Sequence, residues 1–151
     1  MSDVYVYDKA KYHNESIFEH GLAEEHAANH AVPILRWFIE NDLMCEKFIS
    51  SSLNEIAEFK AGKMTIHELY FRLGNCLTST MFSKRGNDFA MYYFDFQRGN
   101  YIKDYRVTLQ GSLPTELHIS YSDDNYKRLK PLIDSAFSRW SSAKSWWKIW
   151  K

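Results

Sequence analysis

The feature that most constrains this chain is the stretch 26–41, which begins polar and then becomes almost wholly apolar. Two adjacent rows of apolar residues recur in it at the i, i+4, i+7, i+11 spacing of one helix face. A helix with so wide an apolar arc has to be covered on more than one side. The stretch therefore predicts a central helix in which Ile34, Leu35, Phe38 and Ile39 are buried.

Pro33 interrupts this predicted helix. It has no N–H group and its ring presses on the carbonyl of Asn29, so the helix either kinks there or begins with Pro33 in its first turn. His26 and His30 stand four residues apart just before this point, a spacing at which two histidines can share one helix face. The zinc-hydrolase motif with this spacing carries Glu directly after its first His, where this chain has Ala27. We therefore predict no metal ligand in this stretch.

The rest of the chain also has mainly helical patterns. Thr65 and Glu68 form a capping box, and Gly62 is a C-terminal stop for the preceding helix. Residues 101–109 fit a helix or a strand. The expected helices are 46–61, 66–73, 81–96 and 126–140, with short strands at 4–7 and 117–121. The predicted fold class is mainly α: a single compact helical domain, residues 1–140, with at most one or two short β-strands.

Residues 141–151 form a Trp/Lys-rich C-terminal extension to this domain. Alternating Trp and Lys suit a membrane interface or a partner's surface. The other interpretation is that Trp147 and Trp150 continue the last helix and pack back on the body. We favour the latter, because so short a basic segment gives only weak membrane-surface contact by itself.

Length and composition narrow the class of protein. A chain of 151 residues is long enough for one domain with a real core, and 45% hydrophobic against 25% charged residues is an ordinary globular balance. The N-terminus has no basic-then-apolar signal pattern, and no apolar run reaches the ~18 residues needed to span a bilayer. We therefore expect a cytoplasmic protein without a transmembrane segment.

Motifs that carry chemistry are absent from the sequence. It contains no phosphate-binding glycine loop, no dinucleotide fingerprint and no nucleophile elbow. Basic residues are scattered in the second half, apart from 127–130 and the extension, with no nucleic-acid-binding motif beside them. We therefore predict no catalytic residues, no cofactor, no metal and no direct nucleic-acid binding. Whether the protein is nevertheless an enzyme stays open.

A resemblance to known proteins rests on segments spread in order over roughly residues 5–140. They are YDKAKYH at 7–13, ANH at 28–30, IEN at 39–41, GNDFA at 86–90, YIKDY at 101–105, DNY at 124–126 and KPLID at 130–134. Together they resemble a family of small bacterial proteins classed as a domain of unknown function. Pro33 and the C-terminal extension depart from the family pattern, and the family has no catalytic residues to transfer.

The resemblance implies a small bacterial protein of the kind found beside secreted toxins. The leading hypothesis is an immunity protein that binds and neutralises a cognate toxin by masking its surface. Many toxins, nucleases among them, carry basic sites, and residues 1–60 hold eleven Asp and Glu against five Lys and Arg. We expect the partner to dock near residues 3–25 with a salt-sensitive on-rate. The expected partner-binding residues are Tyr5, Asp8, Tyr12, Glu15, Phe18, Glu19, Glu24 and Glu25.

The alternative hypothesis is a small-ligand-binding protein or an enzyme. Such a protein needs titratable groups that converge in one cleft. The candidates for a polar pocket of this kind are His13, His30 and Asp104.

Overall fold

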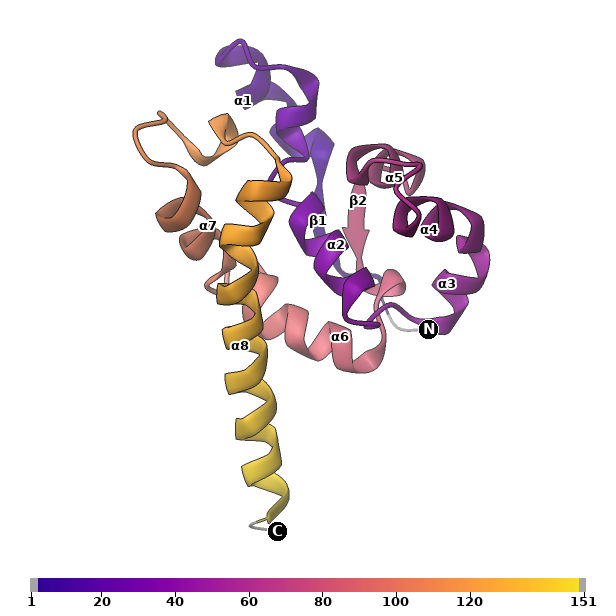
Figure 1. The fold of residues 1–151 in the computed structure, drawn as a ribbon. Helices are drawn as coiled ribbons and strands as arrows, with labels where there is room; N and C mark the ends of the chain where they lie inside the picture. The colour runs from indigo at the N-terminus through magenta and orange to yellow at the C-terminus, as the bar shows by residue number, and fades with distance from the viewer. Residues whose placement is uncertain (1–2, 150–151) are drawn as a thin grey trace.

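Helix α2 (Val32–Glu40) lies at the centre of the computed structural model, which describes residues 3–149 and the side chains of residues 3–145 (Figure 1). Pro33 stands in its first turn, where a missing N–H costs no helical hydrogen bond. The chain before it forms a short 3₁₀ helix and a turn, so the proline begins the helix and does not kink it. Ile34, Leu35, Phe38 and Ile39 are all buried, as predicted.

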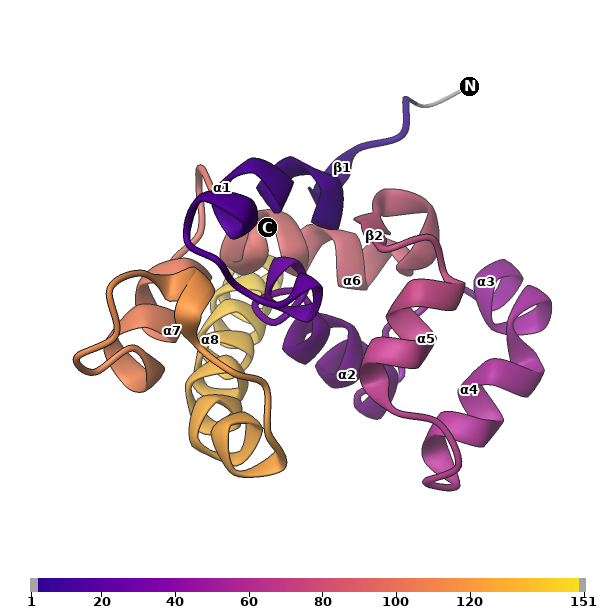
Figure 2. The same cartoon turned by 90° about the horizontal axis from the view of Figure 1, so that it is seen from above.

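The other helices surround α2 on several sides. Viewed from above, α7 and α8 lie on one side of α2 and α3, α4 and α5 on the other, with α6 and the two strands between them (Figure 2). This arrangement confirms a single, mainly helical domain. The elements are β1 (Val6–Lys9), η1 (Ala10–His13), α1 (Asn14–Glu19), η2 (Glu24–Ala27), α2, α3 (Glu46–Ser51), α4 (Leu53–Lys60), α5 (Ile66–Arg72), β2 (Cys76–Thr78), η3 (Ser79–Met81), α6 (Lys84–Phe89), η4 (Ala90–Phe94), α7 (Tyr101–Leu109), η5 (Glu116–His118) and α8 (Asp123–Ile149).

Aromatic rings fill the space around α2. The indole of Trp37 is fully buried, with the ring centroids of Phe89 and Phe137 each 5.3 Å away. Phe38 stacks on Phe82 at 4.1 Å. The indole N–H of Trp37 donates a 2.9 Å hydrogen bond to Asp134 on α8, which satisfies the polar atom of a large apolar side chain. These contacts join α2, α6 and α8 into one aromatic core.

The strands β1 and β2 form a two-stranded antiparallel sheet, in which Asp8 pairs with Leu77. The register shifts between Val6 and Asp8, and both Tyr7 and Asp8 are buried instead of alternating between core and solvent. The β-prone start of the chain predicts β1 approximately. The strand expected at 117–121 is wrong: the short 3₁₀ helix η5 occupies its beginning, capped by the Thr115 side chain.

Local signals predict helix ends better than helix lengths. The capping box of Thr65 and Glu68 is present at the start of α5. Residues 46–61 form two helices, α3 and α4, which meet at Ser52. Residues 81–96 form α6 and then a π-helical turn that ends before Asp95. Residues 101–109, for which the sequence allowed either type, form helix α7.

Helix α8 runs without a break from the body into the C-terminal extension, and its end projects past the other helices (Figure 1). The backbone of residues 141–149 therefore continues the last helix. The packing expected of Trp147 and Trp150 falls outside the residues whose side chains the structure describes. No helix within residues 3–149 combines the length and the hydrophobicity that crossing a membrane requires.

Candidate functional site

Two histidines meet one aspartate close to the start of the chain. Nε2 of His13 lies 2.8 Å from Oδ1 of Asp8, and Nε2 of His30 lies 2.9 Å from its Oδ2. The two imidazole rings contact each other edge to face, with centroids 4.5 Å apart. Asp8 and His30 are buried, whereas the side chain of His13 keeps 23% of its surface exposed. The arrangement is a buried carboxylate held between two imidazoles, with one side reachable by solvent.

The ionisation of Asp8 fixes the protons of this cluster. Burial would raise the pKa of the Asp8 carboxyl, but the hydrogen bonds from His13 and His30 outweigh burial and lower the pKa to about 2. The carboxylate is therefore ionised at neutral pH and can only accept hydrogen bonds. Each imidazole accordingly carries a proton on Nε2 and donates it to Asp8.

The cluster is assembled by three separate segments. Asp8 comes from β1, His13 ends η1, and His30 lies in the turn that leads into α2. The hydroxyl of Tyr101 donates a 2.7 Å hydrogen bond to the backbone carbonyl of His30, which holds that turn against α7. The ring of Phe96 lies 5.5 Å from the imidazole of His30 and covers it. Backbone pairing and apolar cover thus fix the two buried members of the cluster.

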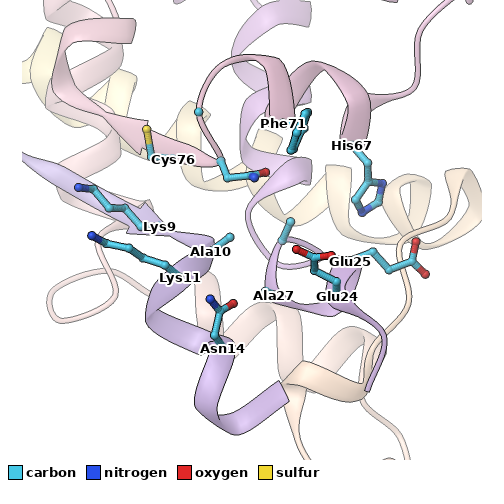
Figure 3. Close-up of a pocket in the computed structure, with 13 residues that line it drawn as sticks. Lys9, Ala10, Lys11, Asn14, Glu24, Glu25, Ala27, His67, Phe71 and Cys76 are labelled. Atoms are coloured by element: carbon cyan, nitrogen blue, oxygen red, sulfur yellow. The ribbon is translucent and has the colours of Figure 1, made fainter. Parts of the chain in front are cut away.

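A cavity of about 560 Å³ opens beside these segments (Figure 3). Lys9 and Lys11 lie on its wall formed by β1 and η1, and Glu24 and Glu25 lie on η2. The cavity thus has groups of both charges beside an apolar lining that includes Phe71 and Ala27. Its complete lining is Lys9, Ala10, Lys11, Asn14, Glu24, Glu25, Ala27, Ala28, His67, Phe71, Gly74, Asn75 and Cys76.

His67 is the one titratable ring in this lining. Its Nε2 lies 2.7 Å from Oδ1 of Asn29, and Nδ2 of Asn29 donates a hydrogen bond to the carbonyl of Ile119. Burial lowers the pKa of His67, so the imidazole is neutral at pH 7. Its Nε2 therefore donates to Asn29, and the ring is held in place as a wall of the cavity.

The three residues expected to form a polar pocket do not all meet. His13 and His30 come together, but around Asp8. Asp104 lies on α7, accepts a 2.7 Å hydrogen bond from the hydroxyl of Tyr93, and lines a separate hollow next to α8. Within residues 3–149 it makes no hydrogen bond to either histidine. We expected Asp104 beside the two histidines, but the aspartate that contacts both of them is Asp8.

The residues expected to bind a partner are exposed, with one exception. Asp8 is only 3% exposed and both of its oxygens are engaged, so its expected role in a partner-binding surface is wrong. The hydroxyl of Tyr5 donates to Asp95, which holds that half-exposed ring in place. The others lie at the surface: Tyr12, Glu15, Phe18, Glu19, Glu24 and Glu25.

Sequence reasoning missed Asp8 as the centre of the cluster and His67 as part of the cavity. Asp8 follows a tyrosine in a β-prone stretch, where alternation would place it at the surface. The register shift in β1 turns the side chain of Asp8 inward instead, and no local sequence pattern predicts such a shift. His67 gains its place from Asn29, thirty-eight residues earlier in the chain, and has no local signal either.

Comparison with known protein families identifies the family of this chain. A family model described as "Domain of unknown function (DUF7832)" matches residues 6–119, which include the Asp8 cluster and the cavity. No curated protein and no solved structure matches the chain.

Proposed function

The chain belongs to the DUF7832 family, a domain of unknown function, and on that premise we propose that it is an immunity protein. It binds a cognate bacterial toxin in the cytoplasm and masks the toxin's working surface. We infer the class of partner from the resemblance to small bacterial proteins found beside secreted toxins. We place the docking surface on the N-terminal part of the chain.

The observation that carries the proposal is the exposure of Phe18. Its ring, on helix α1, is 87% exposed and is the most exposed large apolar side chain in the described part of the chain. The neighbouring Ile17 points inward and anchors the helix, so Phe18 is presented on a fixed support. Tyr12, on the adjoining η1, is 61% exposed. Exposed aromatic residues on a rigid support are typical anchors of protein–protein interfaces.

Unpaired acidic groups surround these rings. Glu15 and Glu19 lie on α1 with Phe18, and Glu24 and Glu25 follow on η2. Among residues 3–145, whose side chains the structure describes, no ion pair involves any of these four carboxylates, although pairs form elsewhere on the surface. Their charge is thus available to a basic partner such as a nuclease, and opposite charge accelerates the encounter of two proteins.

Co-expression with the product of the adjacent gene tests the proposal. That product should harm cells that lack this protein, and the two purified proteins should form a stable complex. Replacing Phe18 by Ala should weaken the complex by about 30-fold or more, the loss typical of an interface anchor. Val107→Ala is the matched control, because this apolar side chain on α7 is 78% exposed but lies outside α1, η1 and η2.

The charge contribution is measured separately, through the association rate. Changing Glu15, Glu19 and Glu24 together to Gln should slow association at low salt and flatten its salt dependence. Changing Glu46 and Glu58, which are exposed on α3 and α4, should not. A neighbouring product that is harmless, or that does not bind, contradicts the immunity function. Binding that survives both sets of changes contradicts this docking surface.

A second candidate function, small-ligand binding, is favoured by the cavity beside β1 and η2. A volume of about 560 Å³ is within the usual range of small-molecule sites. Lysines on one wall and glutamates on another suit a ligand that carries both charges. Thermal-shift screening of zwitterionic metabolites tests it, with His67→Ala as the variant that should abolish any shift.

A further inference from the structure

We propose that Asp8, His13 and His30 bind one divalent transition-metal ion through Oδ of the aspartate and Nε2 of each histidine. The proposal does not depend on the proposed toxin binding. The three side chains come from parts of the chain that the sequence spacing does not connect. The proposal rests on their geometry, their charge and the chemistry of the donor atoms.

The geometry is close to that of a metal site. The three candidate ligand atoms all lie within 4.8 Å of one another. Zinc–nitrogen and zinc–oxygen bonds of about 2.0–2.1 Å put the ligand atoms of a tetrahedral site about 3.3 Å apart. The Asp8–His13 and Asp8–His30 distances of 2.8 and 2.9 Å are slightly shorter than this. Small side-chain shifts therefore convert the hydrogen-bonded cluster into a three-ligand site.

The charge of the cluster favours a cation. Asp8 is buried, and burying an ionised carboxylate is costly unless an opposite charge compensates it. No lysine or arginine in the described part of the chain lies within ion-pair distance of it; its partners are His13 and His30. A divalent ion bound to the carboxylate supplies positive charge beside it, and each imidazole binds that ion through Nε2 once its proton has moved to Nδ1.

The donor set indicates which ions fit. Two imidazole nitrogens and one carboxylate oxygen suit zinc, iron(II), cobalt(II) or manganese(II), and are a poor set for calcium or magnesium, which prefer oxygen ligands. Three protein ligands leave at least one coordination position for water or another ligand. The exposed side of His13 gives solvent a route to that position.

The i, i+4 histidine pair that the sequence displays is not this site. Nδ1 of His26 lies 2.7 Å from the carbonyl of Leu117 and takes no part in the cluster. His30 turns instead to Asp8, and His13 comes from the other side. The metal site thus uses one member of the pair, together with two residues that the pattern did not connect to it.

Cobalt(II) is the probe of choice, because its visible absorption reports coordination number and ligand type. The full chain, stripped with a chelator and dialysed, is titrated with cobalt(II) and, by calorimetry, with zinc. We expect one equivalent of each to bind, with cobalt bands typical of a nitrogen–oxygen site, and the melting temperature to rise with zinc.

The decisive variant is His13→Gln, because His13 is partly exposed and its loss leaves the buried pair of Asp8 and His30 intact. The loss of a direct ligand should weaken zinc binding by about 100-fold or more. His20→Gln is the matched control: His20 is exposed at the end of α1, and its ring lies 5.0 Å from that of His118. Circular dichroism and the melting temperature of each metal-free variant show whether it has folded.

The outcomes separate clearly. Absence of stoichiometric cobalt or zinc binding by the wild-type chain overturns the proposal, as does equal binding by wild type and the folded His13→Gln variant. Equal loss in His20→Gln would indicate adventitious binding by surface histidines and overturns it too. Binding that is lost with His13→Gln and kept with His20→Gln supports it. None of these measurements uses a toxin, so they leave the immunity proposal untouched.

Discussion

The aromatic core around Trp37 and the cluster around Asp8 are both buried, but different forces hold them. In the core, rings of α2, α6 and α8 pack on one another and only one polar atom, the indole nitrogen, needs a partner. In the cluster, the polar side chains are held by hydrogen bonds to one carboxylate. Burial in the core stabilises by itself, whereas burial in the cluster is unfavourable without these bonds. The same degree of burial thus marks a structural region in one case and a candidate functional site in the other.

The largest expected effect is in the aromatic core. Replacing Phe38 by Ala leaves a cavity beside Phe82 and should lower the free energy of unfolding by about 3–5 kcal/mol. Chemical denaturation measures the loss. Phe71→Ala on the exposed face of α5 should change stability by less than about 0.5 kcal/mol. A loss of less than about 1 kcal/mol for Phe38→Ala would show that α2 is not the centre of the core.

The next effect is in the cluster. Asp8→Asn keeps the shape of the side chain but removes the charge that both imidazoles bind. Because charge-assisted hydrogen bonds contribute about 1.5–3 kcal/mol each, and the amide keeps part of them, the metal-free protein should lose about 2–3 kcal/mol. Urea denaturation in the presence of chelator measures it. An unchanged free energy of unfolding would mean that the cluster does not stabilise the fold.

The two regions should also respond differently to acid. The pKa of Asp8 is lowered on folding, so its contribution is present above its unfolded value near 4 and is lost as the pH falls toward 2. In metal-free protein the stability gap between wild type and Asp8→Asn should therefore narrow by about 2 kcal/mol from pH 5 to pH 2. The gap between wild type and Phe38→Ala should stay constant. Denaturation series at several pH values compare the two gaps.

The smallest expected effect concerns a third kind of side chain, apolar but exposed. Phe18→Ala should change the free energy of unfolding by less than about 0.5 kcal/mol, since its ring is 87% exposed. The same substitution should weaken toxin binding. A stability loss above about 1 kcal/mol would instead give Phe18 a role in the fold and remove the argument for a docking surface.

The difference between local sequence patterns and contacts made by distant segments explains what the sequence could predict. The burial of Ile34 and Phe38 and the capping box of Thr65 follow from spacings of a few residues, and the structure confirms them. The break at Ser52 and the π-helical turn after Phe89 depend on how neighbouring segments pack, and helical periodicity alone did not show them.

The candidate site was only partly predictable for the same physical reason. The sequence drew attention to His13 and His30 as titratable groups, but a pair of side chains far apart in the chain has no local pattern. Asp104 is as plausible a partner as Asp8 in the sequence alone. The register shift in β1 and the turn before Pro33 decide between them, and both depend on tertiary contacts.

The pairing of Asp8 with Leu77 has a consequence for how the protein is made. β1 is synthesised first but cannot join a sheet until β2 leaves the ribosome. At about 5–20 residues per second, the intervening stretch takes roughly 3–14 s to synthesise. During that time Asp8 has no strand to hold it and the nascent chain has no completed cluster. Residues 3–25, by contrast, emerge early. The N-terminal segment that carries the proposed docking surface is therefore synthesised before the sheet that stabilises it can form.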